Sequence, residues 1–270
     1  PPVWVLTSFL PASEAELQAI HGALSARWRQ LGAPQPLCWV YQCRHEGRTE
    51  TRLMAGEVPE PHVVSEHGAR FKVHVLRGQN HGLFLDMAEG RAWVHRHVHT
   101  HPRQARLRVL NLFAYTCAFS VVALQAGAHH VVNVDMSHGA MGIGQQNHHL
   151  NDVAAGASFL AHDIFKSWGK VGRMGPYDLV IVDPPSYQKG SFVATKDYAR
   201  LMRRLPDLLM PGGHAMLCLN APELDSAFLR DQMQSLVPEL TFVERVANPA
   251  VFADVSPERA LKVLVYRLPA

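Results

Sequence analysis

The spacing of hydrophobic residues changes near residue 108. From there to residue 268, short apolar runs alternate with longer segments whose apolar residues recur at helical spacing. The runs predict strands at residues 108–113, 130–136, 157–163, 177–185, 212–220 and 261–268. The segments between them predict helices that include 118–128, 139–151 and 196–210. This alternation is typical of an α/β fold with a mostly parallel sheet and helices on both faces.

The first 68 residues follow a different pattern. Residues 3–9 indicate a strand, and residues 13–31 indicate a helix with Ser13 as N-cap and Glu16 three residues later. Residues 36–45 and 49–57 indicate two strands around a turn at Glu46 and Gly47. We predict a small N-terminal α+β domain over residues 1–68. A β-hairpin and a helix starting near Gly90 then occupy residues 69–107 and lead into a Rossmann-like domain over 108–270.

Composition and charge narrow the class of protein. Hydrophobic residues make up 47% of the chain and charged residues 18%, which is typical of a globular protein. No apolar run approaches the roughly 20 residues of a membrane span, and no signal-peptide pattern opens the chain. We therefore expect a cytoplasmic protein without a membrane segment. The net charge of +3 permits a nucleic-acid partner without requiring one.

Histidines and cysteines offer little metal chemistry in this sequence. His95, His97, His99 and His101 alternate and would share one face of a strand. No carboxylate or thiolate flanks them, so we expect no metal site and a weakly basic segment instead. The four cysteines form no CxxC pair and are expected to be buried thiols.

Polar residues follow four of the predicted strands, where the carboxyl ends of parallel strands share one edge. They are Asn111 to Thr116, then Asp135, then Asp163, and finally the segment Asp183 to Tyr187. Asp135 lies 24 positions after Asn111, close to the roughly 20-residue offset of a carboxylate that binds ribose hydroxyls. Unpaired buried carboxylates are costly, so three at successive strand ends indicate a ligand site at this edge.

The turn "NLFAYTCAFS" after the first of these strands contains no glycine. Glycines in a dinucleotide-binding loop let the backbone approach a pyrophosphate, so their absence disfavours a nicotinamide oxidoreductase. S-adenosylmethionine carries an adenosine but no phosphate. The turn therefore favours methyl transfer.

Five segments together resemble a known family. The segments "NHGLFLDMAEGR", "VLNLFAYTCAFSVVALQAGA", "VDMS", "HDIF" and "DLVIVDPPSY" are similar to S-adenosylmethionine-dependent methyltransferases of bacterial large-subunit ribosomal RNA, with cytosine-C5 and guanine-N7 members. The resemblance covers roughly residues 71 to 268 and implies a Rossmann-like class I methyltransferase fold.

The resemblance also implies roles for individual residues. The methionine end of the cofactor would contact Asn111, Phe113, Tyr115 and Thr116, and the ribose hydroxyls would bind Asp135. The adenine would lie against Met136 and Phe165, with its amino group donating to Asp163. Phe84 would close over the cofactor, and the methyl group would face Asp183, Pro184 and Pro185. Two positions depart from the family pattern: Cys117 replaces a glycine and Ala88 replaces an arginine, whereas Arg91 keeps a second arginine.

The residues also bear on which atom is methylated. Cytosine-C5 members use a cysteine nucleophile, and Asn220 stands at that position, while Cys218 is expected to be packed in the core. The Asp183 side chain and the Pro184 carbonyl suit an amine or a ring nitrogen, and Tyr187 could stack on a flipped base. The sequence therefore favours a purine nitrogen. A double proline that merely ends a buried strand, with Tyr187 in the core, is the alternative reading.

Basic residues favour RNA, and ribosomal RNA by resemblance, as the substrate. One helix face would carry Lys196, Arg200, Arg203 and Arg204, with Lys189 and Arg91 extending the same surface. A solvated helix face is an equally simple interpretation of these cations. Methylation of a small molecule or a protein, and a degenerate RNA-binding module without catalysis, are the alternative functions.

Overall fold

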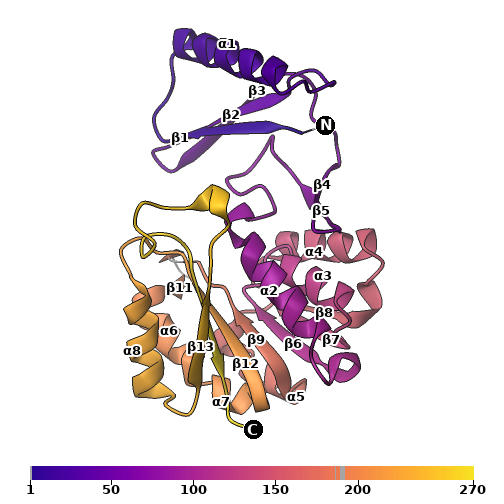
Figure 1. Cartoon of the computed structure of the whole chain (residues 1–270), viewed down its shortest axis with the longest axis vertical. Coiled ribbons are helices and arrows are strands. Elements are labelled where there is room, and N and C mark those ends of the chain that lie inside the picture. The colour runs from indigo at the N-terminus through magenta and orange to yellow at the C-terminus, as the bar shows by residue number, and fades with distance from the viewer. Residues whose placement is uncertain (1, 186, 189–191) are drawn as a thin grey trace. The chain divides into compact units, whose positions relative to one another are not determined.

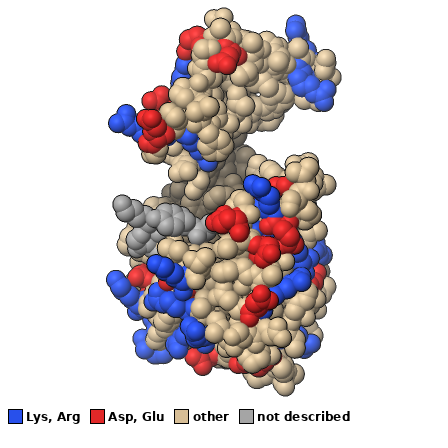
Figure 2. Space-filling model, turned by 90° about the vertical axis from the view of Figure 1, so that its left-hand side faces the viewer, with Lys and Arg blue, Asp and Glu red and all other residues tan. Residues whose placement is uncertain are grey.

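The computed structural model describes residues 2–185, 187–188 and 192–270. The chain packs as two compact units, each continuous in space but not in sequence (Figure 1 and Figure 2). The smaller unit comprises Pro1–Val64 and Lys72–Leu83, and the larger unit comprises Ser65–Phe71 and Phe84–Ala270. The predicted division at residues 68 and 107 stays a prediction. Among the described residues, no helix combines the length and the apolar character needed to cross a bilayer.

The smaller unit is a three-stranded sheet with one helix. Its elements are β1 (Trp4–Ser8), α1 (Glu14–Gln30), β2 (Trp39–His45) and β3 (Arg48–Ala55). The strand order is β1-β2-β3, with β1 parallel and β3 antiparallel to β2. Helix α1 begins with the predicted capping box, in which Ser13 and Glu16 each accept a backbone N–H of the other. The core of this unit includes Leu17, Trp39 and Tyr41.

A hairpin and a helix precede the main sheet. The hairpin consists of β4 (His62–Glu66) and β5 (Ala69–Val73), and η1 (Leu85–Met87) runs into α2 (Ala88–His99). The helix thus starts two residues before the predicted Gly90. His95, His97 and His99 lie on this helix, so the alternating histidines do not share one face of a strand. The buried positions of this segment, such as Gly90, Val94 and Val98, follow helical spacing, and that spacing decides its structure.

The larger unit contains a seven-stranded sheet in the order β13-β14-β12-β9-β6-β7-β8. All neighbouring pairs are parallel except those made by β14, which confirms the predicted mostly parallel sheet. The strands are β6 (Arg108–Leu112), β7 (His130–Val134), β8 (Ala157–Leu160), β9 (Tyr177–Val182), β12 (Leu209–Leu219), β13 (Thr241–Val246) and β14 (Lys262–Arg267). A two-stranded ribbon is formed by β10 (Tyr187–Gln188) and β11 (Phe192–Val193).

Helices cover both faces of this sheet, as predicted. In Figure 1, α2, α3 and α4 lie on one side and α6 and α8 on the other. The helices that follow α2 along the chain are α3 (Ala118–Gln125), α4 (His138–Leu150), α5 (Trp168–Arg173), α6 (Ala194–Met202), α7 (Leu205–Leu208) and α8 (Ser226–Leu236). Short 3-10 turns are η2 (Gln104–Arg106), η3 (Ala154–Gly156), η4 (Ile164–Lys166) and η5 (Ala250–Phe252). The helix predicted over 196–210 is two helices, because Pro206 starts α7 and cannot continue α6.

The two faces of the sheet have different cores. Leu110, Leu112 and Val180 belong to the large apolar cluster that also contains residues of α6 and α8. On the other face a chain of neutral polar groups is buried between the strands, α3 and α4. Asn111 donates to Asn133, Asn133 donates to Ser120, and Ser120 lies 2.8 Å from His148 Nε2. This polar chain lies directly beneath the turn that follows β6.

Candidate functional site

The turn after β6 is of the type that binds ligands, although it contains no glycine. Phe113, Tyr115 and Cys117 have φ angles of 57°, 47° and 61°, so every second residue is left-handed. Each such residue costs about 1–2 kcal/mol when it carries a Cβ. Backbone hydrogen bonds hold the loop, from Ala114 N to Val134 O at 3.0 Å and from Cys117 N to Ala114 O at 2.7 Å. The glycine-free sequence therefore adopts a turn that glycine would form more easily.

Cys117 is accommodated by a glycine on the facing helix. The Cys117 side chain is fully buried and packs with Met141, and a Cβ at Gly144 would lie only 2.5 Å from its sulfur. Burial raises the pKa of the Cys117 thiol far above its usual value, so the thiol stays neutral. This cysteine therefore fills space under the turn.

Asp135 closes the turn from the end of β7. Its Oδ2 accepts the backbone N–H of Tyr115 at 2.8 Å, and its Oδ1 accepts that of Ser137 at the same distance. A carboxylate has about four acceptor positions, so each oxygen can accept one more hydrogen. The partly exposed Asp135 carboxylate can thus accept from two ribose hydroxyls while holding the turn.

Asp163 and Phe165 lie at the end of the neighbouring strand β8. Asp163 Oδ1 accepts the Phe165 N–H at 2.9 Å, and its Oδ2 is 3.7 Å from Lys166 Nζ. The Phe165 ring is partly buried, with the Phe192 ring 6.5 Å away and the Arg200 guanidinium 3.8 Å from its centroid. An adenine edge presented to Asp163 would meet an aromatic wall.

Exposed apolar side chains flank the turn. The Phe84 and Tyr115 rings are 5.4 Å apart, and 44% of Phe84 is accessible. Met136, directly after Asp135, is 51% accessible. Large apolar side chains left open beside a carboxylate are suited to a flat, partly apolar ligand such as an adenosine.

Two predicted cofactor residues lie deeper than the others. Asn111 and Thr116 are each 1% accessible. The Thr116 carbonyl accepts from Asn147 on α4, whereas Asn111 Oδ1 has no hydrogen-bond partner among the residues that the structure describes. The ammonium group of a bound cofactor could donate to this Asn111 oxygen, while the Asn111 amide nitrogen already donates to Asn133.

Asp183 ends β9 and faces the same edge. Its backbone N–H points to Leu112 O at the end of β6. Protein atoms surround its carboxyl group densely, and this burial, with the nearby charge of Asp86, raises its pKa to about 7. The positive charge of Arg91 opposes the shift. Pro184 is buried and Pro185 half-buried. Near neutral pH, Asp183 can therefore hold or release a proton.

Arg91 is not a surface residue, which corrects the prediction that it extends the basic surface. It is 3% accessible and makes two hydrogen bonds to the Glu66 carboxylate, at 2.6 and 2.7 Å. This bidentate pair ties α2 to hairpin residue Glu66. Sequence reasoning missed both Glu66, the partner of Arg91, and Asp86, the acid near Asp183, because no pattern in the sequence marks these contacts.

Cys218 is fully buried in β12, as predicted, and burial raises the pKa of its thiol well above the usual value. Asn220, two residues later, is exposed. The chain thus has no accessible thiol at the position where cytosine-C5 members carry their nucleophile.

The Tyr187 prediction is only partly within the description. The Tyr187 backbone pairs with Val193 in the β10-β11 ribbon, whereas its side chain, like all of Lys189, lies outside the described residues. Of the predicted basic stripe, Lys196 and Arg200 lie on α6, whereas Arg203 and Arg204 lie between α6 and α7, and two of the four are paired. Arg200 contacts Asp197 at 2.9 Å and Arg204 contacts Asp207 at 3.2 Å. Lys196 and Arg203 make no ion pair with any described residue.

Groups of three or more metal-binding side chains suited to a metal ion are absent from the described part of the chain.

Comparison with known proteins places the chain in a family. A family model described as S-adenosylmethionine-dependent methyltransferase matches residues 2–267. Ribosomal RNA large subunit methyltransferase I of Aeromonas salmonicida is 32% identical over 191 residues, covering 66% of this chain and 47% of that protein. Ribosomal RNA large subunit methyltransferase K/L of Psychrobacter sp. is 36% identical over 183 residues, covering 64% of this chain and 21% of that protein. The chain spans half or less of the length of these curated relatives.

Solved structures agree with this assignment. The methyltransferase SMU.776, crystallised with SAH, has a TM-score of 0.81 and 25% identity over 98% of this chain and 69% of that chain. An S-adenosylmethionine-dependent methyltransferase from Agrobacterium tumefaciens shares the fold, with a TM-score of 0.68 and 21% identity over 84% of this chain and 76% of that chain. These matches confirm the predicted Rossmann-like fold, family and cofactor. The chain belongs to the family of S-adenosylmethionine-dependent methyltransferases.

Proposed function

We propose that this chain methylates RNA in the cytoplasm, with ribosomal RNA as its substrate and a purine nitrogen as the acceptor. The names of the relatives from Aeromonas and Psychrobacter support ribosomal RNA. The observation that carries the choice of nitrogen is Asp183, a carboxyl group with its pKa raised to about 7 at the end of β9. The buried Cys218 and the exposed Asn220 argue against a thiol nucleophile and hence against carbon-5 of cytosine.

In this proposal the cofactor lies along the carboxyl edge of β6, β7 and β8. Asp135 accepts from the ribose hydroxyls, and Asp163 accepts from the adenine amino group. Phe84, Met136 and Phe165 cover the apolar faces. The turn residues Asn111, Phe113, Tyr115 and Thr116 surround the methionine end. Bound S-adenosylmethionine supplies an electrophilic methyl group on its sulfonium.

Asp183, Pro184 and Pro185 present the acceptor base to that methyl group. If the acceptor is an exocyclic amine, Asp183 and the Pro184 carbonyl accept its hydrogens, and the carboxylate takes the proton that the nitrogen loses. If the acceptor is a ring nitrogen with an in-plane lone pair, Asp183 accepts from a neighbouring N–H and orients the ring. Tyr187 is proposed to stack on the flipped base.

The test separates cofactor binding from methyl transfer. Asp183→Asn should lower methyl transfer to hypomethylated ribosomal RNA by at least about 100-fold while leaving S-adenosylmethionine affinity nearly unchanged. Asp135→Ala should weaken S-adenosylmethionine binding by at least about tenfold, as measured by isothermal titration. Asp231→Asn, at an exposed carboxylate of α8, is the matched control and should change neither quantity.

Full activity of both Asp183→Asn and Asp135→Ala would refute the site. Activity on a protein or small molecule, with weak dependence on salt and none on RNA, would replace the substrate in the proposal. RNA binding without any affinity for S-adenosylmethionine would indicate a degenerate binding module instead.

A further inference from the structure

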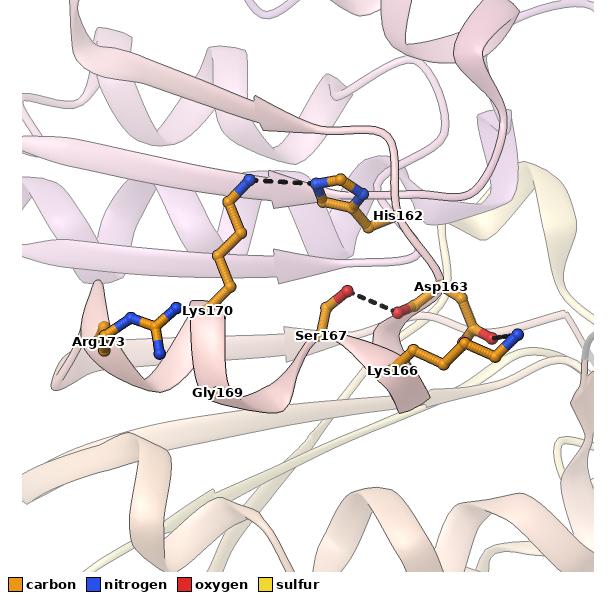
Figure 3. A pocket seen from close by; sticks show the side chains of 7 residues that line it. All are labelled: His162, Asp163, Lys166, Ser167, Gly169, Lys170 and Arg173. Carbon is orange, nitrogen blue, oxygen red and sulfur yellow. Dashed lines mark hydrogen bonds and ion pairs between the residues drawn. The ribbon is translucent and has the colours of Figure 1, made fainter.

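A surface pocket lies beside Asp163, formed by residues that follow the edge strand β8. It has a volume of about 540 Å3 and is lined by His162, Asp163, Lys166, Ser167, Gly169, Lys170 and Arg173. Figure 3 shows these residues arranged along η4 and α5, with Lys170 reaching back toward His162 at the end of β8. We call this the β8 pocket.

The charge of the β8 pocket is strongly one-sided. Lys166, Lys170 and Arg173 contribute three cations, whereas Asp163 is the only acid in the lining. Lys166 Nζ is 3.7 Å from Asp163 Oδ2, so that carboxylate already has a cation beside it. Arg173 makes no ion pair and no side-chain hydrogen bond within the described part of the chain. The pocket therefore has surplus positive charge available to an anion.

One of these cations is held in place by a neutral side chain. Lys170 Nζ lies 3.1 Å from His162 Nε2 and donates to it, which leaves the other ammonium hydrogens available. The Ser167 hydroxyl is already used, since it donates to the Asp163 carbonyl at 2.8 Å. Figure 3 shows both interactions. The ligand would thus be recognised by Lys166, Lys170 and Arg173.

Two further cations, Arg200 of α6 and Arg204 just after it, lie beside aromatic rings next to the pocket lining. The Arg200 guanidinium lies 3.8 Å from the centroid of Phe165, and the Arg204 guanidinium lies 5.5 Å from that of Trp168. Phe165 and Trp168 contact each other, and they lie in η4 and at the start of α5, the two elements that line the pocket. Cations from two separate segments therefore lie beside this aromatic pair.

We propose that the β8 pocket binds a backbone phosphate of the RNA substrate, outside the region that enters the active site. Lysines act as point charges for phosphate, and the arginine fork can donate two hydrogens to phosphate oxygens. The neighbouring cations Arg200 and Arg204 then bind the next part of the strand. This inference rests on the proposed RNA substrate and adds a contact surface that lies beyond Asp163, away from the methyl group.

The experiment compares RNA affinity and its salt dependence among variants. Lys170→Ala combined with Arg173→Ala should weaken binding of a ribosomal RNA fragment by about tenfold at low salt, measured by fluorescence anisotropy. The slope of log affinity against log salt should fall by about 0.7 for each lost contact to a single strand. Lys170→Arg in place of Lys170→Ala should retain most of the RNA affinity, because arginine keeps the positive charge.

Two controls separate this inference from the proposed function. Arg230→Ala removes an exposed cation that lies 4.7 Å from the ring of Phe242 in β13, at the opposite end of the sheet, and should leave affinity and slope unchanged. S-adenosylmethionine affinity of the double variant should also be unchanged, which shows that the fold is intact.

If the unaltered chain and the double variant bind RNA with the same affinity and the same salt slope, the β8 pocket does not contact RNA. The proposed RNA substrate is not affected by that outcome. If the unaltered chain binds no RNA, both proposals fail. If inorganic phosphate binds the pocket but the double variant binds RNA normally, the pocket is a small-anion site and the inference is wrong.

Discussion

The Asp183 carboxyl group, which we propose to act in methyl transfer, lowers the stability of the folded chain as the pH rises. Its pKa in the folded chain is about 7, against an ordinary value of 3.8. Between these values the unfolded chain releases the proton while the folded chain keeps it, so the free energy of unfolding falls as pH rises. Asp183→Asn removes this loss. It should raise stability at pH 8 by about 2 kcal/mol, even though it abolishes methyl transfer.

Urea unfolding at pH 8 and pH 4 tests this. At pH 4 Asp183 is protonated in the folded chain, so the stability difference between Asp183→Asn and the unaltered chain should nearly vanish. A difference that does not change with pH would contradict the assigned environment of Asp183.

Substitutions at Cys117 and at Gly144 should have effects on stability that depend on each other. Gly144→Ala places a methyl group 2.5 Å from the Cys117 sulfur and should cost about 1–2 kcal/mol, despite the better helix propensity of alanine. In a Cys117→Gly background the sulfur is gone, so the same substitution should be neutral or stabilising. Denaturant unfolding of the four proteins gives the coupling, expected near 2 kcal/mol. Additive effects would show that the two residues do not compete for space.

At the scale of elements, the contact between α2 and β12 is sensitive to acid. The His97 ring stacks on Trp93 at 4.7 Å and meets the His214 ring at 4.5 Å. Burial, and then the neighbouring His214 and His101, lower the pKa of His97 to about 3. Burial, and then Arg267 and His101, lower the pKa of His214 to about 4. The folded chain therefore keeps both rings neutral at pH values where the unfolded chain protonates them. Stability is full above pH 6.5 and is lost as the pH falls toward 4.

His97→Phe keeps a ring against Trp93 and removes one of these titrating groups. The decrease in unfolding free energy between pH 7.5 and pH 5 should shrink by about 1–2 kcal/mol in this variant, as measured by urea denaturation. His95→Phe changes an exposed histidine of the same helix and serves as the control. Equal acid sensitivity in both variants would refute the role of His97.

Prediction of elements from sequence succeeded where burial controls the pattern. The strands β6, β7 and β9 and the second half of β12 are mostly apolar because helices cover both faces of the sheet. The edge strand β13 was not predicted, since four of its six residues are exposed and no apolar run marks it. The alternation of the histidines on α2 has no structural meaning, because the buried positions of that segment recur at helical spacing.

At the scale of the whole molecule, the candidate site was predictable in its acids and not in their surroundings. Parallel strands bring Asp135, Asp163 and Asp183 to one edge, and this follows from the order of elements alone. The raised pKa of Asp183 depends on Asp86, and the buried Arg91 depends on Glu66 of a distant hairpin. Such contacts depend on three-dimensional packing and leave no periodic signal in the sequence.

The position of β14 has a consequence for biosynthesis. It follows both of its neighbours along the chain, yet it lies between them in the sheet, paired to β12 on one side and to β13 on the other. Both neighbours leave the ribosome earlier and keep an open edge until residue 267 has emerged. A premature stop after Val246 would therefore remove β14 from the interior of the sheet. It would detach β13, expose the edge of β12 to pairing with other chains, and favour aggregation of the truncated product.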